Sequence, residues 1–328
     1  MNVSFDVAPL ILDNAGTARY VRGVLDALRR RDDVEVHDRT WGGPGRLTAA
    51  LRDVTWYPLL LPRQARRDAV LHCTTFRAPL RSPVPVVVTV HDLAVIRHPE
   101  LFTAWTRLYA RTLLLPVLRA ATRVLAVSEF TKREVVELAG VPEERIDVAY
   151  NASSSPAFTP EGPAAEGEYV LAVGTLEPRK NLPRLIEATA SLGLELRIAG
   201  ARGWGGVDPS AAHVRWLGRP TDIELATQFR GALCLAYPSL LEGFGIPVLE
   251  AMRTGTPVVT SAGSAMEEVA GGAAELVDPH DVASIAAGIE RTLARRDDLR
   301  RAGFLRAAEF SWDATAEATV RSYGAACT

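Results

Sequence analysis

Short apolar segments alternate with amphipathic segments along this chain, in two blocks. The first block has apolar runs at 84–92, 121–128 and 146–151, of which VPVVVTVHD (84–92) is the richest in β-branched residues. The second block has runs at 169–174, 194–200, 214–218, 232–239, 256–261 and 273–278. Continuous apolar runs of this length are typical of strands buried on both faces of a parallel sheet. The repeated strand–helix units therefore predict an α/β protein with one doubly wound parallel sheet in each block.

A segment without periodicity separates the two blocks. Residues 152–168 (ASSSPAFTPEGPAAEGE) are rich in Pro, Gly, Ser and Ala, as linkers are. A chain of 328 residues also exceeds what one core usually supports. We expect a Rossmann-like domain at 1–158, a second at 159–309, and a C-terminal helix at 310–328 that either completes the second domain or crosses back to the first.

Composition favours a soluble protein of the cytoplasm. No apolar run approaches the ~20 residues of a membrane span, and the start, MNVSFDVAPL, lacks the basic region of a signal peptide. The three cysteines are too widely spaced for a disulfide framework or a metal knuckle, which favours a reducing compartment. A net charge of -2 gives no overall attraction to nucleic acid.

Two carboxylates bracket the segment EGFGIPVLEAM (242–252), which is otherwise glycine and apolar. Because the preceding strand ends near Tyr237, we expect Glu242 in a strand-end loop and Glu250 about one turn into a helix that starts near Pro247. Free N–H groups at a helix N-terminus suit a phosphate, and carboxylates suit hydroxyl groups. The segment therefore fits a nucleotide sugar. The alternative is a pair of acids that only stabilise the helix N-terminus.

Two cations follow another strand. In GTLEPRKNLPRLIEA (174–188), Arg179 and Lys180 are adjacent where a helix is expected to start. Cations are unfavourable at a helix N-terminus, so the pair indicates a bound diphosphate. The alternative is a solvated pair of bases.

Two positions in the first block also lie at the ends of expected strands. His91 stands at the end of the strand at 84–92, and Gly16 lies between an early strand and the helix expected in 14–28. At the carboxyl ends of such strands, a histidine could contact a ligand and a glycine could admit a phosphate. A structural role for His91 is the alternative.

Taken together, these segments resemble the retaining glycosyltransferases of family 4, whose GT-B fold has two Rossmann-like domains and an interdomain cleft. The resemblance covers nearly the whole chain in order, including VSEFTKREV, YPSLLEGFGIPVLEAM, GTPVVTS and FSWDATAE. Its most specific part is the E-x7-E element from Glu242 to Glu250, together with EPRKN (177–181).

The resemblance implies a role for each matching residue. Arg179 and Lys180 would hold the donor diphosphate and stabilise its charge as it leaves, and Glu242 would contact hydroxyl groups of the donor sugar. Glu250 would bind the ribose, and His91 would contact the sugar near the reacting centre. The implied catalytic residues are His91, Arg179, Lys180 and Glu242. The implied donor-binding residues are Gly16, Gly174, Arg179, Lys180, Glu242, Gly243, Phe244, Gly245, Ile246 and Glu250, with backbone N–H groups of the 243–245 loop and the following helix on sugar and phosphate.

The chain departs from the family pattern at two positions. The first loop of the family often has a second glycine, where this chain has Ala18. The family also often has an acid where this chain has Gly272, so no site residue is assigned there.

The resemblance implies transfer of a hexose from a nucleotide diphosphate sugar to a hydroxyl acceptor, with retention of configuration. The EPRKNL segment resembles that of mannosyltransferases, which indicates GDP-mannose. The acceptor would be a glycan, a lipid-linked compound or a small molecule. Without any Asp-x-Asp in the sequence, we expect neither a metal nor another cofactor. A nucleotide-sugar 2-epimerase and a non-catalytic nucleotide-sugar-binding protein are the alternatives.

One segment of the first domain has two interpretations. Residues 54–72 mix aromatic and leucine side chains with Arg63, Arg66 and Arg67. The favoured interpretation is a helix with one packed and one solvated side. The other is peripheral contact with the inner face of a membrane, as in some relatives.

Overall fold

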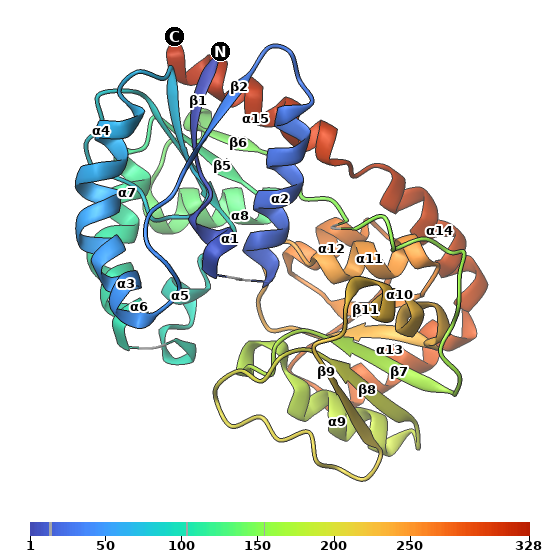
Figure 1. The fold of residues 1–328 in the computed structure, drawn as a ribbon. Helices are drawn as coiled ribbons and strands as arrows, with labels where there is room; N and C mark the ends of the chain where they lie inside the picture. The colour runs from blue at the N-terminus through green and yellow to red at the C-terminus, as the bar shows by residue number, and fades with distance from the viewer. Residues whose placement is uncertain (13–14, 103, 154) are drawn as a thin grey trace. The chain divides into compact units, whose positions relative to one another are not determined.

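The chain forms two compact units in the computed structural model, which describes residues 1–12, 15–102, 104–153 and 155–328 (Figure 1). Unit 1 comprises Met1–Ala152 and Ser311–Thr328, and unit 2 comprises Ser153–Phe310. The division precedes the boundary expected after residue 158. Phe158 explains the difference, because its ring is buried in unit 2 against Phe229 at 5.9 Å between centroids. Asn14 and Ser154, which belong to the segments analysed above, lie outside the described residues.

Unit 1 contains a parallel six-stranded sheet in the order β2-β1-β3-β4-β5-β6. Its strands are β1 Asn2–Asp6, β2 Glu35–Arg39, β3 Val70–Cys73, β4 Val86–Val90, β5 Arg123–Ala126 and β6 Ile146–Val148. Its α-helices are α1 Ala8–Leu12, α2 Ala15–Arg29, α3 Arg46–Leu51, α4 Leu61–Ala65, α5 Ala94–Arg97, α6 Ala104–Tyr109, α7 Leu115–Ala120, α8 Glu129–Glu134 and α15 Trp312–Cys327. Three π-helical segments at Arg52–Leu60, Ala110–Leu114 and Val135–Ala139 and two 3₁₀ turns at Pro99–Leu101 and Glu143–Arg145 complete the described part of the unit.

Unit 2 contains a second parallel six-stranded sheet, in the order β12-β11-β10-β7-β8-β9. Its strands are β7 Tyr169–Val173, β8 Glu195–Ala199, β9 Val214–Gly218, β10 Cys234–Tyr237, β11 Val258–Ser261 and β12 Glu275–Val277. Its helices are α9 Leu182–Ser191, α10 Asp222–Gly231, α11 Ile246–Thr254, α12 Ala265–Ala270, α13 Val282–Ala294 and α14 Arg296–Ala308, with a 3₁₀ turn at Pro178–Lys180. The predicted α/β class with two doubly wound parallel sheets is confirmed.

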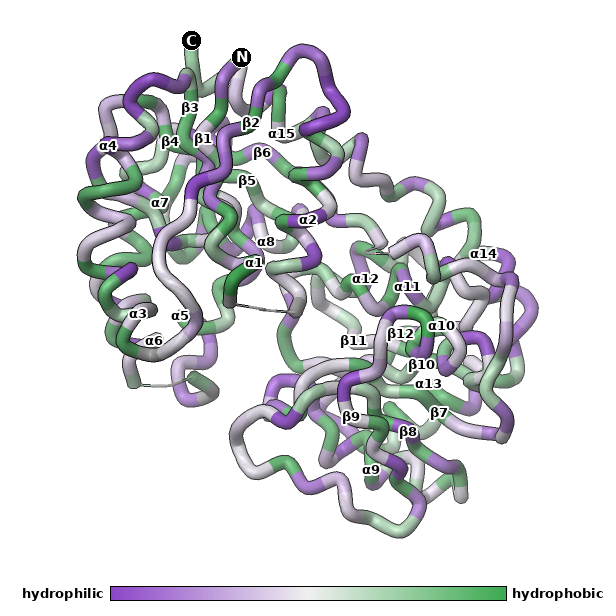
Figure 2. Tube along the Cα trace, in the orientation of Figure 1, coloured by the Kyte–Doolittle hydropathy of each residue, from purple (hydrophilic) through white to green (hydrophobic). Residues whose placement is uncertain are grey.

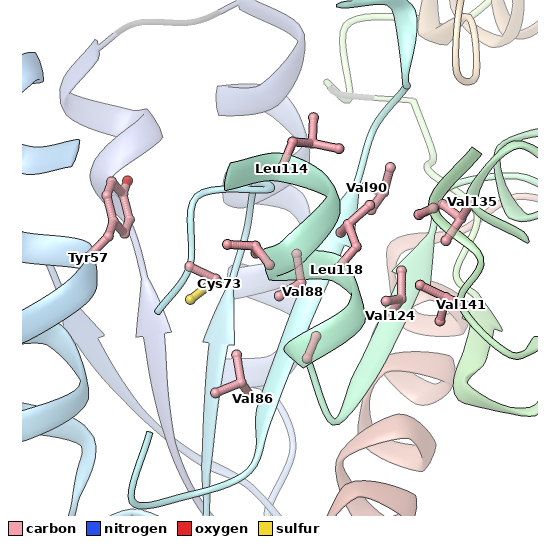
Figure 3. Close-up of a cluster of buried hydrophobic side chains, with 14 of the residues drawn as sticks. Tyr57, Cys73, Val86, Val88, Val90, Leu114, Leu118, Val124, Val135 and Val141 are labelled. Carbon is pink, nitrogen blue, oxygen red and sulfur yellow. The ribbon is translucent and has the colours of Figure 1, made fainter. Parts of the chain in front are cut away.

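The strands form where the sequence is apolar and β-branched. All five residues of β4 are buried, as are all four of β10. In Figure 2 the central strands are mainly hydrophobic, whereas the edge strand β2 is largely hydrophilic. One side of the unit 1 sheet packs on a cluster that includes Val88, Val124 and Leu118 of α7 (Figure 3). Helix covers on both faces are what make uninterrupted apolar strands stable.

Helix ends also follow the sequence. The Ser128 hydroxyl accepts a hydrogen bond from the backbone N–H of Thr131, so it caps α8, as a serine directly before a helix often does. The helical segment continues as far as Gly140, which adopts the left-handed conformation (φ 64°) and ends it.

The last helix, α15, packs within unit 1. It contacts α2 and the strands β3, β4, β5 and β6. Its Thr315 hydroxyl donates to the backbone carbonyl of Tyr150, and its Tyr323 is fully buried. Helix α2 approaches it closely at Gly23, where an added Cβ would lie 2.1 Å from the Trp312 indole.

This close approach makes Gly23 sensitive to substitution. We expect Gly23→Ala to lower the free energy of unfolding of unit 1 by about 1–3 kcal/mol, because α2 and α15 must separate to admit the methyl group. The matched control is Gly324→Ala on α15, where an added Cβ meets nothing within 4 Å. Urea unfolding followed by circular dichroism measures both. Equal stabilities for the two variants would contradict the prediction.

Candidate active site

The loops that follow β7 and β10 meet at the carboxyl edge of the unit 2 sheet. These two strands are neighbours in the sheet. From β7 the chain continues to β8, toward one edge, and from β10 it continues to β11, toward the opposite edge. Ligands of open α/β sheets bind at such a switch point. The backbone N–H of Leu240 in the second loop donates to the carbonyl of Arg179 in the first, at 2.8 Å. The fold therefore brings the two predicted charged motifs together.

Four charged side chains from these loops form one cluster, the switch-point cluster of Glu177, Arg179, Lys180 and Glu242. The Arg179 guanidinium lies 2.7 Å from a carboxylate oxygen of Glu242 and 2.7 Å from one of Glu177. Lys180 Nζ lies 2.6 Å from the other oxygen of Glu242 and donates to the Tyr237 hydroxyl at 2.5 Å. Glu242 therefore bonds to both predicted phosphate-binding cations.

In this cluster, burial and the nearest opposite charges shift the pKa values of the side chains in opposite directions. Burial alone would raise the pKa of Glu242, but Arg179 and Lys180 outweigh it and hold the pKa at about 2. Burial lowers the pKa of Lys180, against the attraction of Glu242. Burial also raises the pKa of Glu177, although Arg179 and Lys180 oppose it. Glu242 is thus firmly ionised, and Glu177 is the more easily protonated of the two acids.

Gly174 makes room for the lysine. Its φ of 143° favours glycine, and an added Cβ would lie 2.7 Å from Lys180 Cε. The Lys180 side chain is buried and also lies over the Tyr237 ring, with Nζ 4.7 Å from the ring centroid. The structure places Gly174 beside the cluster, where it shapes the path of a charged side chain.

The sequence had predicted that the two cations lie at the start of a helix. In the structure they lie outside α9. They lie in the 3₁₀ turn Pro178–Lys180, and α9 starts only at Leu182, because Asn181 between them adopts the left-handed conformation (φ 59°). The Asn181 amide donates to the carbonyls of Pro238 (3.1 Å) and Pro279 (2.6 Å). Sequence reasoning missed the positions of Asn181 and Glu177 in the site, although both belong to the EPRKN segment.

Helix α11 begins beside the cluster. Gly245 is its N-cap in the left-handed conformation (φ 95°), and Pro247 lies in the first turn, near where the sequence placed the start. An added Cβ at Gly245 would lie 2.9 Å from the Met266 side chain. The loop from Gly243 to Gly245 thus turns tightly into a helix whose first N–H groups suit an anion.

The other predicted donor-binding residues of this loop and helix have covered side chains. Phe244 is buried against Phe310, with ring centroids 5.8 Å apart, and Ile246 is buried as well. Glu250 lies in α11 with 0% of its surface exposed. Side-chain packing of Phe244 and Ile246 leaves their backbone groups as the parts suited to a ligand.

In unit 1, His91 follows β4 and is held by its neighbours. Its Nε2 lies 3.0 Å from the backbone carbonyl of Thr74, and since a carbonyl only accepts, Nε2 carries the proton. Burial lowers the pKa of His91, so the ring is neutral near pH 7 with an unprotonated Nδ1. The arrangement suits accepting a hydrogen bond from a hydroxyl group.

A buried chain of hydrogen bonds supports that histidine. The Tyr20 ring lies edge-on to His91, with centroids 4.9 Å apart. The Tyr20 hydroxyl bonds to Thr89 at 2.9 Å, Thr89 to His72 at 2.8 Å, and His72 to Tyr323 of α15 at 2.7 Å. Burial lowers the pKa of His72 to about 3, so this network stays neutral.

Gly16 lies in the first turn of α2. It is exposed, and an added Cβ would meet nothing within 4 Å. Ala18, where the family often has a second glycine, is buried. The structure therefore leaves open space beside Gly16 and closes it beside Ala18.

Comparisons with known proteins match both units. The model for glycosyl transferases group 1 matches residues 157–304, and the model for glycosyltransferase family 4 matches residues 15–153. The chain is 33% identical over 317 residues to the O-antigen chain mannosyltransferase B of Escherichia coli, covering 85% of this chain and 83% of that protein. The chain belongs to the family 4 glycosyltransferases. It is also 31% identical over 280 residues to the D-inositol 3-phosphate glycosyltransferase of Mycolicibacterium smegmatis, covering 75% of this chain and 63% of that protein.

Solved structures resemble this glycosyltransferase over almost its whole length. The sucrose-phosphate synthase of Thermosynechococcus elongatus has a TM-score of 0.75 at 20% identity, covering 99% of this chain and 98% of that one. Anabaena HepE in complex with UDP and glucose has a TM-score of 0.72 at 18% identity, covering 99% of both chains. The predicted GT-B fold is confirmed.

In the glycosyltransferase, the segment 54–72 is helical only as far as Ala65, and this part packs on one side, as the favoured interpretation predicted. The interpretation was wrong for its end, because residues 70–72 belong to the buried strand β3. Trp56, Tyr57 and Leu61 are buried, whereas Val54 and Leu59 are 56% and 51% exposed. No helix in the described part of the chain is both long and apolar enough to cross a bilayer. Nor do the described residues include a group of three or more His, Cys, Asp or Glu placed to hold a metal ion.

The cluster makes the glycosyltransferase sensitive to acid. The pKa of Glu242 is about 2 in the folded protein, against an ordinary value of 4.5, so the unfolded chain binds more protons between these values. The ion pairs of Glu242 therefore contribute their full stabilisation above pH 4.5, and this contribution is lost as the pH falls from 4.5 toward 2. We expect the wild type to lose about 3 kcal/mol more than Glu242→Gln over this window, measured by urea unfolding. Parallel stability curves for the two proteins would contradict the prediction.

Proposed function

We propose that this glycosyltransferase is a retaining hexosyltransferase that moves mannose from GDP-mannose to a hydroxyl acceptor. The observation that carries the proposal is the switch-point cluster, in which Arg179 and Lys180 lie beside Glu242 at the carboxyl ends of β7 and β10. Cations and free N–H groups bind a diphosphate, and carboxylates accept hydrogen bonds from sugar hydroxyls. This part of unit 2 combines all three kinds of group.

Each group has one task in the proposed reaction. Arg179 and Lys180 bind the diphosphate and stabilise the negative charge that grows as it leaves. Glu242, held ionised by both cations, accepts hydrogen bonds from sugar hydroxyls, and Glu250 binds the ribose. For unit 1, the proposed roles are that Gly16 admits a phosphate of the donor and that the neutral His91 accepts a hydrogen bond from a sugar hydroxyl through Nδ1.

The bond changes in the proposed reaction are balanced without a protein nucleophile. The acceptor oxygen forms a bond to the anomeric carbon on the face from which the phosphate departs, while the bond from that carbon to the phosphate oxygen breaks. The acceptor proton passes to the departing phosphate. No metal takes part, because Arg179, Lys180 and the first N–H groups of α11 supply the positive potential.

The proposed donor and acceptor follow from a relative, and the proposed membrane contact follows from the surface of unit 1. The likeness to an O-antigen chain mannosyltransferase favours mannose and a glycan or lipid-linked acceptor. On the surface of unit 1, the exposed apolar Val54 and Leu59 and the exposed Arg63 and Arg66 favour peripheral contact with a membrane at its cytoplasmic face.

A donor panel tests the proposed function. The protein is incubated with GDP-mannose, UDP-glucose and ADP-glucose, with and without EDTA, and the release of nucleoside diphosphate is measured. We expect release from GDP-mannose that EDTA leaves largely intact. Conversion of the sugar without release would indicate an epimerase, and binding without either would indicate a binding protein. Activity abolished by EDTA and restored by Mg²⁺ or Mn²⁺ would overturn metal independence.

His91 gives a second prediction about activity. We expect His91→Ala to lower kcat by ~10²-fold with little change in stability, whereas His91→Asn, which keeps an acceptor oxygen near the Nδ1 position, loses less. Since burial lowers the pKa of His91, wild-type kcat should not fall as the pH drops through the ordinary histidine range. The matched control is His98→Ala, at a histidine of the same segment whose side chain is 43% exposed. Wild-type kcat in His91→Ala would remove this residue from the site.

A further inference from the structure

The two cations of the switch-point cluster are already engaged by protein carboxylates. Arg179 bridges Glu177 and Glu242, at 2.7 Å from each, and Lys180 bonds to Glu242 at 2.6 Å. All four side chains come from the loops after β7 and β10. Two positive and two negative groups give a formal charge of zero, so the cluster has no spare positive charge when both acids are ionised.

A nucleotide sugar brings two negative charges to this neutral cluster. In a mostly buried setting, an uncompensated charge is strongly unfavourable, and groups there change protonation state instead. One of the two glutamates must therefore lose contact with Arg179, gain a proton, or both. Glu242 is the less suitable, because it bonds to both cations.

We propose that Glu177 is a positioning residue that holds Arg179 until the donor diphosphate displaces it, and that a proton then enters the cluster on Glu177. This inference rests on the proposed function, since it takes the diphosphate to be bound by Arg179 and Lys180. On binding, Arg179 turns a donor N–H from the Glu177 carboxylate to a phosphate oxygen. The proton comes from solvent and neutralises the carboxylate left behind.

The surroundings of Glu177 favour this exchange. Its side chain is only 4% exposed, and its one ion-pair partner among the described residues is Arg179, whereas Glu242 has two. The charged groups that act on it are Arg179, Lys180 and Glu242. Arg202 on the adjoining segment lies over the Trp216 ring, at 4.8 Å from its centroid.

The direction of the pKa shift of Glu177 also favours uptake of a proton. Burial already raises this pKa, and Arg179 is the largest of the groups that lower it. Movement of Arg179 to the phosphate removes that stabilisation, and two new negative charges nearby raise the pKa further. Binding of the donor is therefore coupled to uptake of a proton, and donor affinity weakens as the pH rises.

The test is calorimetric titration with GDP-mannose, and in parallel UDP-glucose, without acceptor. Intact nucleotide sugars are the right probes. A free nucleoside diphosphate has a terminal phosphate with a pKa of about 6, so its own protons would add to those measured. Titrations near neutral pH in buffers of different ionisation enthalpy measure the protons taken up. Kd is then measured at a mildly acidic and a mildly basic pH for the wild type and for Glu177→Gln, which imitates the protonated acid.

For the wild type, we expect uptake approaching one proton and a Kd that rises by at most about tenfold per pH unit. Glu177→Gln should take up no proton and bind about 3- to 10-fold more tightly at basic pH, because Arg179 has lost its competing carboxylate. The matched control is Glu275→Gln, at a buried acid that bonds to Arg291 and Arg295 at the start of β12. This control should behave as the wild type.

The outcomes separate the two proposals. Donor binding without proton uptake, together with equal Kd values for the wild type and Glu177→Gln, would overturn the role of Glu177 and leave the donor site in place. If neither nucleotide sugar binds to any of the three proteins, the proposed donor site fails, and the role of Glu177 fails with it.

Discussion

The candidate site depends on the ion pairs that the Glu242 carboxylate makes with Arg179 and Lys180. Glu242 lies in the loop after β10 and bonds to Arg179 and Lys180 in the loop after β7, so it ties together the two ends of the switch point. Without it, a buried lysine would lack its ionic partner, and removing one member of a buried pair destabilises far more than removing both. The same ion pairs that fix the two loops also neutralise both cations.

The two units stabilise their polar residues in different ways. In unit 2, the cluster is ionic, and its charges balance among themselves. In unit 1, the polar chain through Tyr20, Thr89, His72 and Tyr323 is neutral, because burial prevents His72 from taking a proton. A neutral network suits the role proposed for His91, which is to present a lone pair to a hydroxyl group. An ionic cluster suits a ligand that brings charge, because its members can exchange partners.

If the switch-point cluster is the donor site, as proposed, its charge balance has a consequence for catalysis. If the cations were unpaired, they would bind any anion tightly and release the diphosphate product slowly. Carboxylates that compete for Arg179 weaken that binding, and the negative charge that grows on the leaving group makes the cations more valuable in the transition state than in the ground state. Glu177 and Glu242 both bond to Arg179, so both would compete with the diphosphate for this cation.

The sequence by itself determined the positions of strands β4 to β12, the cap at Ser128, the helix end at Gly140 and the adjacency of each charged motif to a strand end. These follow from local patterns, namely apolar runs, turn residues and residues that cap helices. It did not reveal β2 or β3, which are short, and β2 is also largely polar. Only the tertiary structure decided that Glu177 pairs with Arg179, that Asn181 separates the cations from α9, that His91 is protonated on Nε2 and that α15 packs on α2. Those features depend on which strands become neighbours and on which side chains lose water there, and no local pattern carries that information.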